Sequence, residues 1–229
     1  MSASLRETAL ARGERQSSLV LYRVARGLLR IVVNPYLRLR AENVQVLDLP
    51  GATVLAPVHR SNLDSALLAT QSSRRIRALG KESLFTTPGV SYLCAALGAI
   101  PVRRGEADRD ALKAAKALLD AGETMIVFPE GGRQKGAVVA ELFDGAAWLA
   151  ARTGARVIPV GIAGTGAALP EGSRWLRRST VAIVAGDPIA APVGDGGGRV
   201  TRQQLQAFTA ELADQLQKAQ DRAEDLARL

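Results

Sequence analysis

Several residue types are scarce in this chain of 229 residues. Only nine residues are Phe, Tyr or Trp, so we expect an aliphatic hydrophobic core. The single cysteine, Cys94, cannot form an intrachain disulfide, and its apolar surroundings predict a small core residue in a reducing compartment rather than a nucleophile. Apolar runs stay well short of the roughly 20 residues that a membrane-spanning helix needs. A cleaved signal peptide is not expected either, because arginines interrupt the apolar part of the N-terminal region.

Positive charge, by contrast, is in excess. The formal net charge is +8. The overall composition, with 47% hydrophobic and 23% charged residues, is typical of a globular protein and excludes a disordered or fibrous chain. Residues 1–40 hold eight arginines and two glutamates, and so account for +6 of this charge. The excess favours an anionic partner, namely a nucleic acid, a membrane surface or a phosphorylated ligand. Few aromatic residues for base stacking and no recognisable nucleic-acid module argue against a nucleic acid.

The N-terminal segment is amphipathic if it is helical. At about 100° per residue, arginines fall on one side of the helix and aliphatic residues on the other, the two sets being Arg12, Arg15, Arg23, Arg26 and Arg30, and Val20, Leu21, Val24, Leu28, Ile31 and Val32. Two interpretations are open at this point. The apolar side lies in a membrane interface near anionic headgroups, or it packs on the rest of the domain while the arginines are solvated. Pro35 is expected to end this helix or to begin a second short one.

Short aliphatic runs alternate with helical periodicity along the rest of the chain. The runs predict strands at residues 53–58, 76–79, 99–102, 124–128, 157–162 and 181–185. The periodicity predicts helices at 108–121, 143–152 and 201–229, the last of which opens with a capping box of Thr201 and Gln204. This alternation predicts one α/β domain at 41–229, with a mostly parallel or mixed central sheet flanked by helices. Basic amphipathic helices at 1–40 precede it.

The only histidine, His59, directly follows a predicted strand, and Asp64 stands five residues later in the first turn of a predicted helix. At this spacing the carboxylate can hold the imidazole in one tautomer, which leaves the other ring nitrogen free to take a proton. Ser61 or Asn62 is expected to cap the helix. Alternatively, Asp64 only complements the helix dipole and His59 is structural. One histidine and one cysteine do not supply the ligands of a zinc site, and no G-x-S-x-G nucleophile motif is present.

Charged residues and glycines follow three other predicted strands. They are Lys81, the pair Arg103 and Arg104, and residues 129–133 (Pro-Glu-Gly-Gly-Arg). In a parallel sheet these residues gather with His59 at one edge. Arginine forks bind phosphate in a bidentate manner, and glycine lets the backbone approach a ligand closely. The alternative is that they are solvated surface charges beside a simple turn.

Four sequence blocks and one intervening segment occur in a recognisable order. The blocks are residues 59–64 (HRSNLD, an H-x4-D motif), 98–105 (GAIPVRRG), 128–133 (FPEGGR) and 157–161 (VIPVG), and the segment is 81–85 (KESLF). An H-x4-D motif alone recurs by chance, but the ordered set covers about residues 52–164. In this order the blocks resemble those of the glycerolipid acyltransferases, the family of 1-acylglycerol-3-phosphate (lysophosphatidic acid) O-acyltransferase.

The resemblance implies that His59 is a general base and that Asp64 orients it. The base would deprotonate the free hydroxyl of a lysophospholipid, which then attacks the thioester of an acyl-CoA or an acyl-carrier protein directly. Further residues receive roles from the same resemblance: Lys81, Arg104 and Arg133 hold the phosphate of the acceptor, Glu130 and Gly131 serve acceptor binding and site geometry, and Pro159 is a wall of the acyl site. It implies no metal or prosthetic group.

Together with the amphipathic N-terminus, the resemblance predicts a protein on an anionic membrane surface, peripheral or monotopic at the cytoplasmic face of the cell membrane. The expected acceptor is 1-acylglycerol-3-phosphate, which gives phosphatidic acid. Three positions depart from the family pattern. Gly132 stands where the family usually has Ser or Thr, Arg103 replaces an often acidic or polar residue, and Val58 replaces a frequent Asn. The alternatives are another lysolipid acceptor, or a noncatalytic membrane protein that binds phospholipid or phosphate.

Overall fold

The computed structural model describes residues 2–102 and 109–229. Within these ranges seven strands form one sheet in the order β1-β7-β6-β2-β5-β3-β4. They are β1 (Arg40–Glu42), β2 (Thr53–Pro57), β3 (Ile76–Lys81), β4 (Ala99–Val102), β5 (Thr124–Ile126), β6 (Arg156–Ala163) and β7 (Ala182–Ala185). β7 runs antiparallel to β6, and the other neighbouring pairs are parallel. The predicted α/β domain with a mostly parallel or mixed sheet is confirmed.

The six predicted strands all form, with ends shifted by one or two residues. β1 was not predicted, because three residues, Arg-Ala-Glu, are too few to show a pattern. It forms at the edge of the sheet by pairing with β7, which lies about 140 residues further along the chain, with Ala41 opposite Ile183. Such a strand depends on a distant partner rather than on its own sequence.

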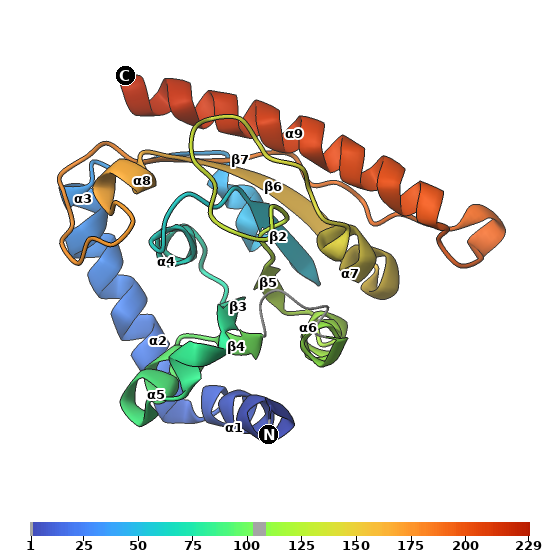
Figure 1. Ribbon diagram of the computed structural model, residues 1–229, viewed down its shortest axis with the longest axis horizontal. Helices are drawn as coiled ribbons and strands as arrows, with labels where there is room; N and C mark the ends of the chain where they lie inside the picture. The colour runs from blue at the N-terminus through green and yellow to red at the C-terminus, as the bar shows by residue number, and fades with distance from the viewer. Residues whose placement is uncertain (1, 103–108) are drawn as a thin grey trace.

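Helices cover both faces of the sheet (Figure 1). One face is covered by α6 (Arg109–Asp120), α7 (Gly145–Thr153) and α9 (Arg202–Arg228). The other side carries α2 (Gln16–Leu28), the π-helical turn Leu29–Val33, α3 (Asn34–Tyr36), α4 (Asp64–Thr70) and α8 (Thr165–Ala168). α1 (Ser2–Gly13) and α5 (Pro88–Ala96) pack together beside the edge strand β4. Three 3-10 turns complete the described elements: Val44–Asp48, Glu82–Phe85 and Asp195–Gly197.

The long helix α9 lies directly on β6. At Gly161 of β6 a Cβ atom would lie 2.1 Å from the carbonyl oxygen of Ala219, so only glycine allows this approach. Gln220 supplies a hydrogen-bond acceptor to the strand, because its Oε1 accepts from the backbone N–H of Ile162 at 2.9 Å. The predicted capping box at Thr201 and Gln204 is confirmed. The glycine of the block at 157–161 thus serves packing behind the sheet.

The N-terminal segment is not the single helix that its periodicity predicts. The chain turns at Glu14 and Arg15, so Arg12 belongs to α1, Arg23 and Arg26 belong to α2, and Arg30 belongs to the π-helical turn that continues α2. At this turn Glu14 forms an ion pair with the buried guanidinium of Arg77 in β3, which also pairs with Glu123. A buried charge requires such partners, and the turn between the helices supplies one. The expectation that all five arginines share one helix side is therefore wrong.

The apolar side of α2 faces outward. Five aliphatic side chains, which we call the α2 stripe, have exposed fractions of 49% to 74%: Val20, Val24, Leu28, Ile31 and Val32. Arg26, by contrast, points inward, and its Nη1 donates to the carbonyl oxygens of Ser72 and Ser73 at 2.8 and 2.7 Å. The interpretation in which the apolar side packs on the domain is therefore contradicted. Pro35 lies in the first turn of α3, as one of the two expectations had it.

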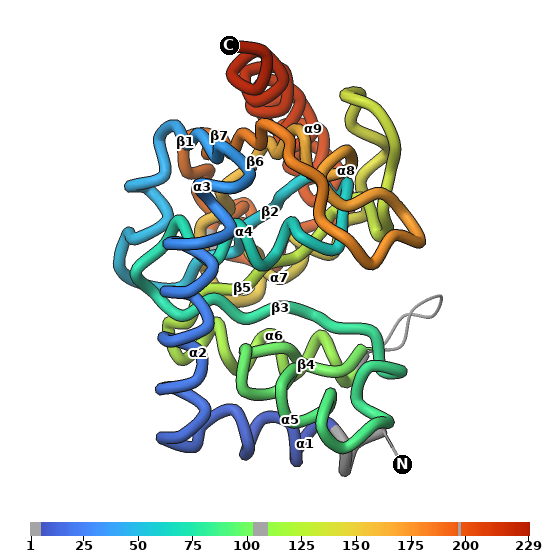
Figure 2. Tube along the Cα trace, turned by 90° about the vertical axis from the view of Figure 1, so that its left-hand side faces the viewer, coloured from blue at the N-terminus to red at the C-terminus, as the bar shows by residue number. Residues whose placement is uncertain are grey.

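Figure 2 looks onto this side of the molecule, where α2 stands beside α4, β3 and α5. Among the residues that the structure describes, no helix is long and apolar enough to cross a membrane.

Candidate active site

His59 lies just beyond the carboxyl end of β2, and Asp64 is the first residue of α4. The imidazole Nδ1 and the carboxylate Oδ2 are 2.9 Å apart, and both side chains are buried. Because a carboxylate only accepts hydrogen bonds, Nδ1 carries the ring proton and Nε2 is left as the nitrogen that can take up a proton. The predicted pairing of His59 with Asp64 is therefore present, in the orientation that a general base needs.

The turn between β2 and α4 fixes the Asp64 carboxylate. Its Oδ2 also accepts from the backbone N–H groups of Arg60 at 2.7 Å and Ser61 at 2.8 Å. Ser61 thus contributes its backbone, whereas its hydroxyl donates to the carbonyl oxygen of Leu169. The second oxygen, Oδ1, is buried and has no hydrogen-bond partner in the described part of the chain. The same turn therefore positions both the carboxylate and the histidine.

Phe128 supplies a second constraint on the imidazole. The two rings stack with centroids 3.9 Å apart and an interplanar angle of 21°. Phe128 follows β5, the neighbour of β2 in the sheet, so the parallel arrangement brings it to the same edge as His59. Its role was not predicted, although it is the first residue of the block FPEGGR.

Glu130 is buried, and its two oxygens face protein donors. Oε2 accepts from the His59 backbone N–H at 2.9 Å and from Arg60 Nη1 at 2.7 Å, while Oε1 accepts from the Ala140 backbone N–H at 3.0 Å. Arg60 in turn donates to the carbonyl oxygens of Gly136 at 2.8 Å and Val138 at 3.3 Å. Glu130 and Arg60 thereby connect the loop at 131–140 to the backbone of the turn that carries His59. The importance of Arg60 was missed, because its partners lie some 70 residues away in the sequence.

Gly131 shapes the turn that follows. Its φ is +69°, in the left-handed region, and a Cβ atom would lie 2.7 Å from the ring of Phe143. The position therefore requires glycine for both its conformation and its packing. Gly132, where the resemblance expects Ser or Thr, has open space around its Cα.

An apolar cavity of about 340 Å³ adjoins His59. It runs along β3, where Lys81 lines it at the carboxyl end and Ile76 at the other end. These two positions are five residues apart along the strand, so the cavity extends over roughly 16 Å. Its walls come from α2, α4, β3, β5 and α5, and include Cys94. Burial raises the pKa of the Cys94 thiol, so this group stays protonated as part of an apolar wall.

A second cavity, of about 440 Å³ and lined by several charged side chains, lies on the other side of the turn between β2 and α4. Arg60, Arg133 and Lys135 line it, and Arg133 Nη2 is 3.0 Å from Oε1 of the exposed Glu171. The structure thus places Lys81 and Arg133 in different cavities that meet at the segment His59–Arg60. Arg104, the third predicted phosphate-binding residue, falls outside the described residues, as does Arg103.

Pro159 lies away from the apolar cavity beside His59. It is buried in β6, where its carbonyl oxygen accepts from the N–H of Gly186 at 2.8 Å. Among the described residues, the wall of the apolar cavity is formed by other side chains, such as Ala78 and Ile126. Pro159 does not line this cavity, because β2 and β5 separate β6 from β3, and its role at an acyl site stays a prediction. In the same described ranges, no group of three or more His, Cys, Asp or Glu residues has the arrangement of a metal site.

Known proteins share this sequence and fold. The chain is 29% identical over 171 residues to the chloroplastic 1-acyl-sn-glycerol-3-phosphate acyltransferase LPAT1 of Arabidopsis thaliana, which covers 72% of this chain and 47% of that protein. It is 30% identical over 146 residues to a 1-acyl-sn-glycerol-3-phosphate acyltransferase of Chlamydomonas reinhardtii, covering 62% and 43% of the two chains. The chain thus spans about half the length of the curated relatives it matches.

The crystal structure of the 1-acyl-sn-glycerophosphate (LPA) acyltransferase PlsC from Thermotoga maritima superposes with a TM-score of 0.67 at 22% identity. That match covers 87% of this chain and 78% of the other, and it shows that the two share a fold. The model of the family described as Acyltransferase matches residues 38–163, which include His59, Asp64, Glu130 and Gly161. This match spans more than half of the chain and confirms the resemblance that the sequence blocks carry. The chain belongs to the Acyltransferase family.

Proposed function

We propose that the protein transfers a fatty acyl group from an acyl thioester, either acyl-CoA or an acyl-carrier protein, to the free hydroxyl of 1-acylglycerol-3-phosphate, giving phosphatidic acid. One observation carries this proposal: the buried His59–Asp64 pair lies at the wall of an apolar cavity whose outer end bears Lys81. The names of the relatives agree with this acceptor.

In the proposed reaction, His59 Nε2 takes the proton of the acceptor hydroxyl as its oxygen attacks the thioester carbonyl. The tetrahedral intermediate then collapses, the carbon–sulfur bond breaks, and the imidazolium returns the proton to the leaving thiolate. Asp64 stabilises the imidazolium through Nδ1. A hydroxyl is a poor nucleophile at neutral pH, and a positioned base contributes about 10²–10⁴ to such a step. The mechanism requires no metal or prosthetic group.

The two substrates differ in polarity, and so do the two cavities. The apolar cavity beside His59 suits an acyl chain, because each buried methylene contributes about 0.8 kcal/mol. Lys81 and Arg133, at the two sides of the catalytic turn, suit the phosphate of the acceptor, and Arg104 is the third candidate from the sequence. Glu130 and Gly131 act in this proposal by fixing the catalytic turn and its loop.

The same proposal places the protein on a membrane surface, peripheral or monotopic, at the cytoplasmic face. The α2 stripe supports it, because five aliphatic side chains of one helical segment are about half or more exposed. Contiguous apolar surface of this kind is typical of an interface with lipid or protein. Exposed Arg23 and Arg30 lie on the same helical segment, where they can reach anionic headgroups.

The test is a matrix of acyl-CoA and acyl-carrier-protein donors against lysolipid acceptors, with products identified by mass spectrometry. We expect phosphatidic acid from 1-acylglycerol-3-phosphate, and a loss of about 10³ in rate for His59→Ala. Lys116→Ala serves as the control, because this lysine forms only an exposed ion pair with Asp120 on the opposite face of the sheet. A His59→Ala protein with the rate of the control contradicts the mechanism, and lipid binding without any product favours a noncatalytic lipid-binding protein.

A further inference from the structure

The segment between α8 and β7 carries an exposed tryptophan among arginines. We call residues 173–178 (Ser-Arg-Trp-Leu-Arg-Arg) the Trp175 loop. Trp175 is 83% exposed, the largest exposure of any bulky apolar side chain among the described residues, and Leu176 is 36% exposed. Arg174, Arg177 and Arg178 are exposed as well. A bulky aromatic side chain in water is unfavourable, and the reaction proposed above does not use it.

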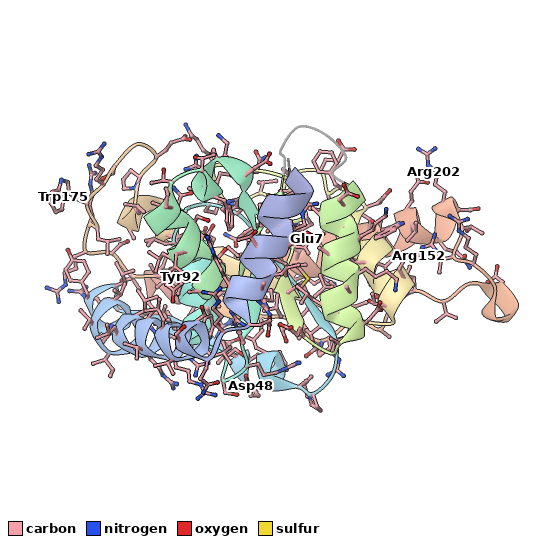
Figure 3. All side chains as sticks on the ribbon, turned by 90° about the horizontal axis from the view of Figure 1, so that it is seen from below. Glu7, Asp48, Tyr92, Arg152, Trp175 and Arg202 are labelled. Carbon is pink, nitrogen blue, oxygen red and sulfur yellow. The ribbon has the colours of Figure 1, made fainter. Side chains whose placement is uncertain are left out.

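The loop is held in place by hydrogen bonds at both ends and at its centre. The Ser173 N–H donates to the Pro170 carbonyl oxygen at 3.0 Å, and the Trp175 N–H donates to the Ser173 hydroxyl at 3.2 Å. The Arg177 N–H donates to the Ala168 carbonyl oxygen at 2.8 Å. These bonds leave the indole directed away from the protein body, as Figure 3 shows at the left end of the molecule. The fold therefore presents Trp175 outward.

The Trp175 loop belongs to the same side of the molecule as the α2 stripe. The Tyr36 hydroxyl of α3, which continues α2, donates to the Leu176 carbonyl oxygen at 3.4 Å. In Figure 1 this loop and α2 both lie at the left of the protein, and Figure 2, which looks onto that side, shows them at its two opposite edges. The apolar cavity borders the protein surface, because Leu84 and Leu97 line it and are 45% and 38% exposed.

We propose that the Trp175 loop is a second lipid-contacting element, which enters the headgroup layer of an anionic bilayer while the α2 stripe lies in the acyl boundary. This inference rests on the proposed function and adds the contact that orients the enzyme. An indole favours the membrane interface, where its apolar ring contacts lipid and its N–H can form a hydrogen bond with water. Arginines on both sides of it complement anionic headgroups. Two separated contacts fix the tilt of the protein and hold the mouth of the apolar cavity against the lipid.

An anionic bilayer fits these observations better than an acidic partner protein does. Arginines alone suit either partner, but the loop also carries the exposed Trp175 and is hydrogen-bonded to α3, which continues α2 with its exposed aliphatic side chains. A strongly acidic, solvated protein surface does not match such apolar side chains. Leu84 and Leu97 at the cavity add further exposed aliphatic side chains.

Tryptophan fluorescence tests the contact directly, since the chain has only two tryptophans, Trp148 and Trp175. The full chain is mixed with phosphatidylcholine–phosphatidylglycerol vesicles whose acyl chains are brominated and therefore quench nearby indoles. We expect quenching and a blue shift for the wild type, and loss of both for Trp175→Phe, which retains Trp148. Equal quenching in the two proteins, or none in a vesicle-bound wild type, overturns the proposal.

Vesicle binding and turnover supply the second test. Trp175→Ala is expected to weaken partition into these vesicles by about tenfold, and Arg178→Gln by about fivefold in a salt-dependent manner. Val193→Ala, which truncates another highly exposed side chain ahead of α9, is the control. Acyl transfer to an acceptor dispersed in detergent is expected to stay unchanged in Trp175→Ala. A loss confined to acyl-carrier-protein donors, with normal vesicle binding, overturns the proposal in favour of a carrier-protein surface.

Failure of this proposal and failure of the proposed function are separable. Fluorescence quenching and vesicle partition do not depend on turnover, whereas the product analysis in detergent does not depend on membrane contact.

Discussion

The turn from β2 to α4, which carries His59 and Asp64, and the α2 stripe have opposite arrangements of charged and apolar side chains. Around His59 the charged groups Asp64 and Glu130 are buried and accept hydrogen bonds from backbone and side-chain donors. Along α2 the aliphatic side chains are exposed, while Arg26 turns inward to backbone carbonyls. Buried charge and exposed apolar surface are both unfavourable in an ordinary soluble domain, and each is therefore informative. We relate the first arrangement to the proposed acyl transfer and the second to the proposed contact with lipid.

The two regions share a wall. Tyr22, Ala25 and Leu29 of the α2 segment line the apolar cavity from one side, and His59 lines it from another. Ile76 connects them further, since its backbone N–H donates to the Tyr22 hydroxyl at 3.1 Å. In the proposed function, an acyl chain that leaves the membrane beside α2 reaches His59 Nε2 through this cavity. The comparison then predicts that substitutions in one region leave the characteristic property of the other unchanged.

The largest effect is expected for Asp64→Asn, which keeps the shape of the side chain and removes its charge. The amide no longer fixes the Nδ1–H tautomer or stabilises the imidazolium, so we expect kcat to fall by about 10³. Steady-state rates with a detergent-dispersed acceptor measure this change, and vesicle partition should equal that of the wild type. Asp214→Asn, in an exposed ion pair with Lys218, is the matched control. A kcat within tenfold of the control's would separate the carboxylate from catalysis.

Glu130→Gln is expected to have the next largest effect, on stability. The substitution leaves the buried guanidinium of Arg60 without its charged partner, which costs about 3 kcal/mol in the free energy of unfolding. Denaturant unfolding measures this difference. Glu171→Gln breaks a comparable pair with Arg133 at an exposed position and should cost less than about 1 kcal/mol. Equal costs in the two variants would mean that burial does not distinguish the catalytic turn from the surface.

Local patterns predicted the elements that depend on nearby residues. His59 and Asp64 are five residues apart across a strand–helix turn, so their spacing was enough to expect the contact. The capping box at Thr201 followed in the same way. Arg60 could not be found from its own neighbourhood, because its partners Glu130 and Gly136 reach it only when the loop folds back over the turn.

The N-terminal region illustrates the same limit. Its periodicity correctly separated the aliphatic residues from most of the arginines, but it did not show which side of the helix faces the protein. Arg77, which is buried and about 60 residues away, forms an ion pair with Glu14 at the turn between α1 and α2, and the local periodicity does not reveal this contact. Similarly, Pro159 lies in a predicted strand, and only the strand order shows that two strands separate it from the cavity.

Leu28→Ser and Ile31→Ser test the other half of the comparison, with smaller expected effects. Each removes an aliphatic side chain that is 60% or 74% exposed, so stability should change by less than about 0.5 kcal/mol. Vesicle partition should fall about tenfold for each, since the lost apolar burial is about 1.5 kcal/mol or more. Val193→Ser, at a position 74% exposed ahead of α9, should leave partition unchanged. An equal fall in all three variants would show a general loss of hydrophobicity rather than a specific contact by α2.

The smallest effect concerns Asp48, which fastens the segment that also receives Arg26. Its Oδ1 accepts from the Ser72 hydroxyl at 2.7 Å and the Ser73 N–H at 2.8 Å. Burial alone would raise the pKa of Asp48, but these hydrogen bonds outweigh it and lower the pKa below its ordinary value. A lowered pKa in the folded state means that the stabilisation is complete above the unfolded value of about 3.9 and is lost as the pH falls through the folded value.

The difference in Tm between the wild type and Asp48→Asn should therefore be constant from neutral pH to about pH 4 and shrink at lower pH. Because Asp48 is exposed, its contribution after solvent screening is below about 1 kcal/mol. Thermal unfolding at a series of pH values measures it, with Asp214→Asn as the reference for an exposed carboxylate. A difference that grows as the pH falls would reverse the sign and show that burial, rather than hydrogen bonding, dominates at this position. The fastening of α2 through Ser72 and Ser73 would then rest on Arg26 alone.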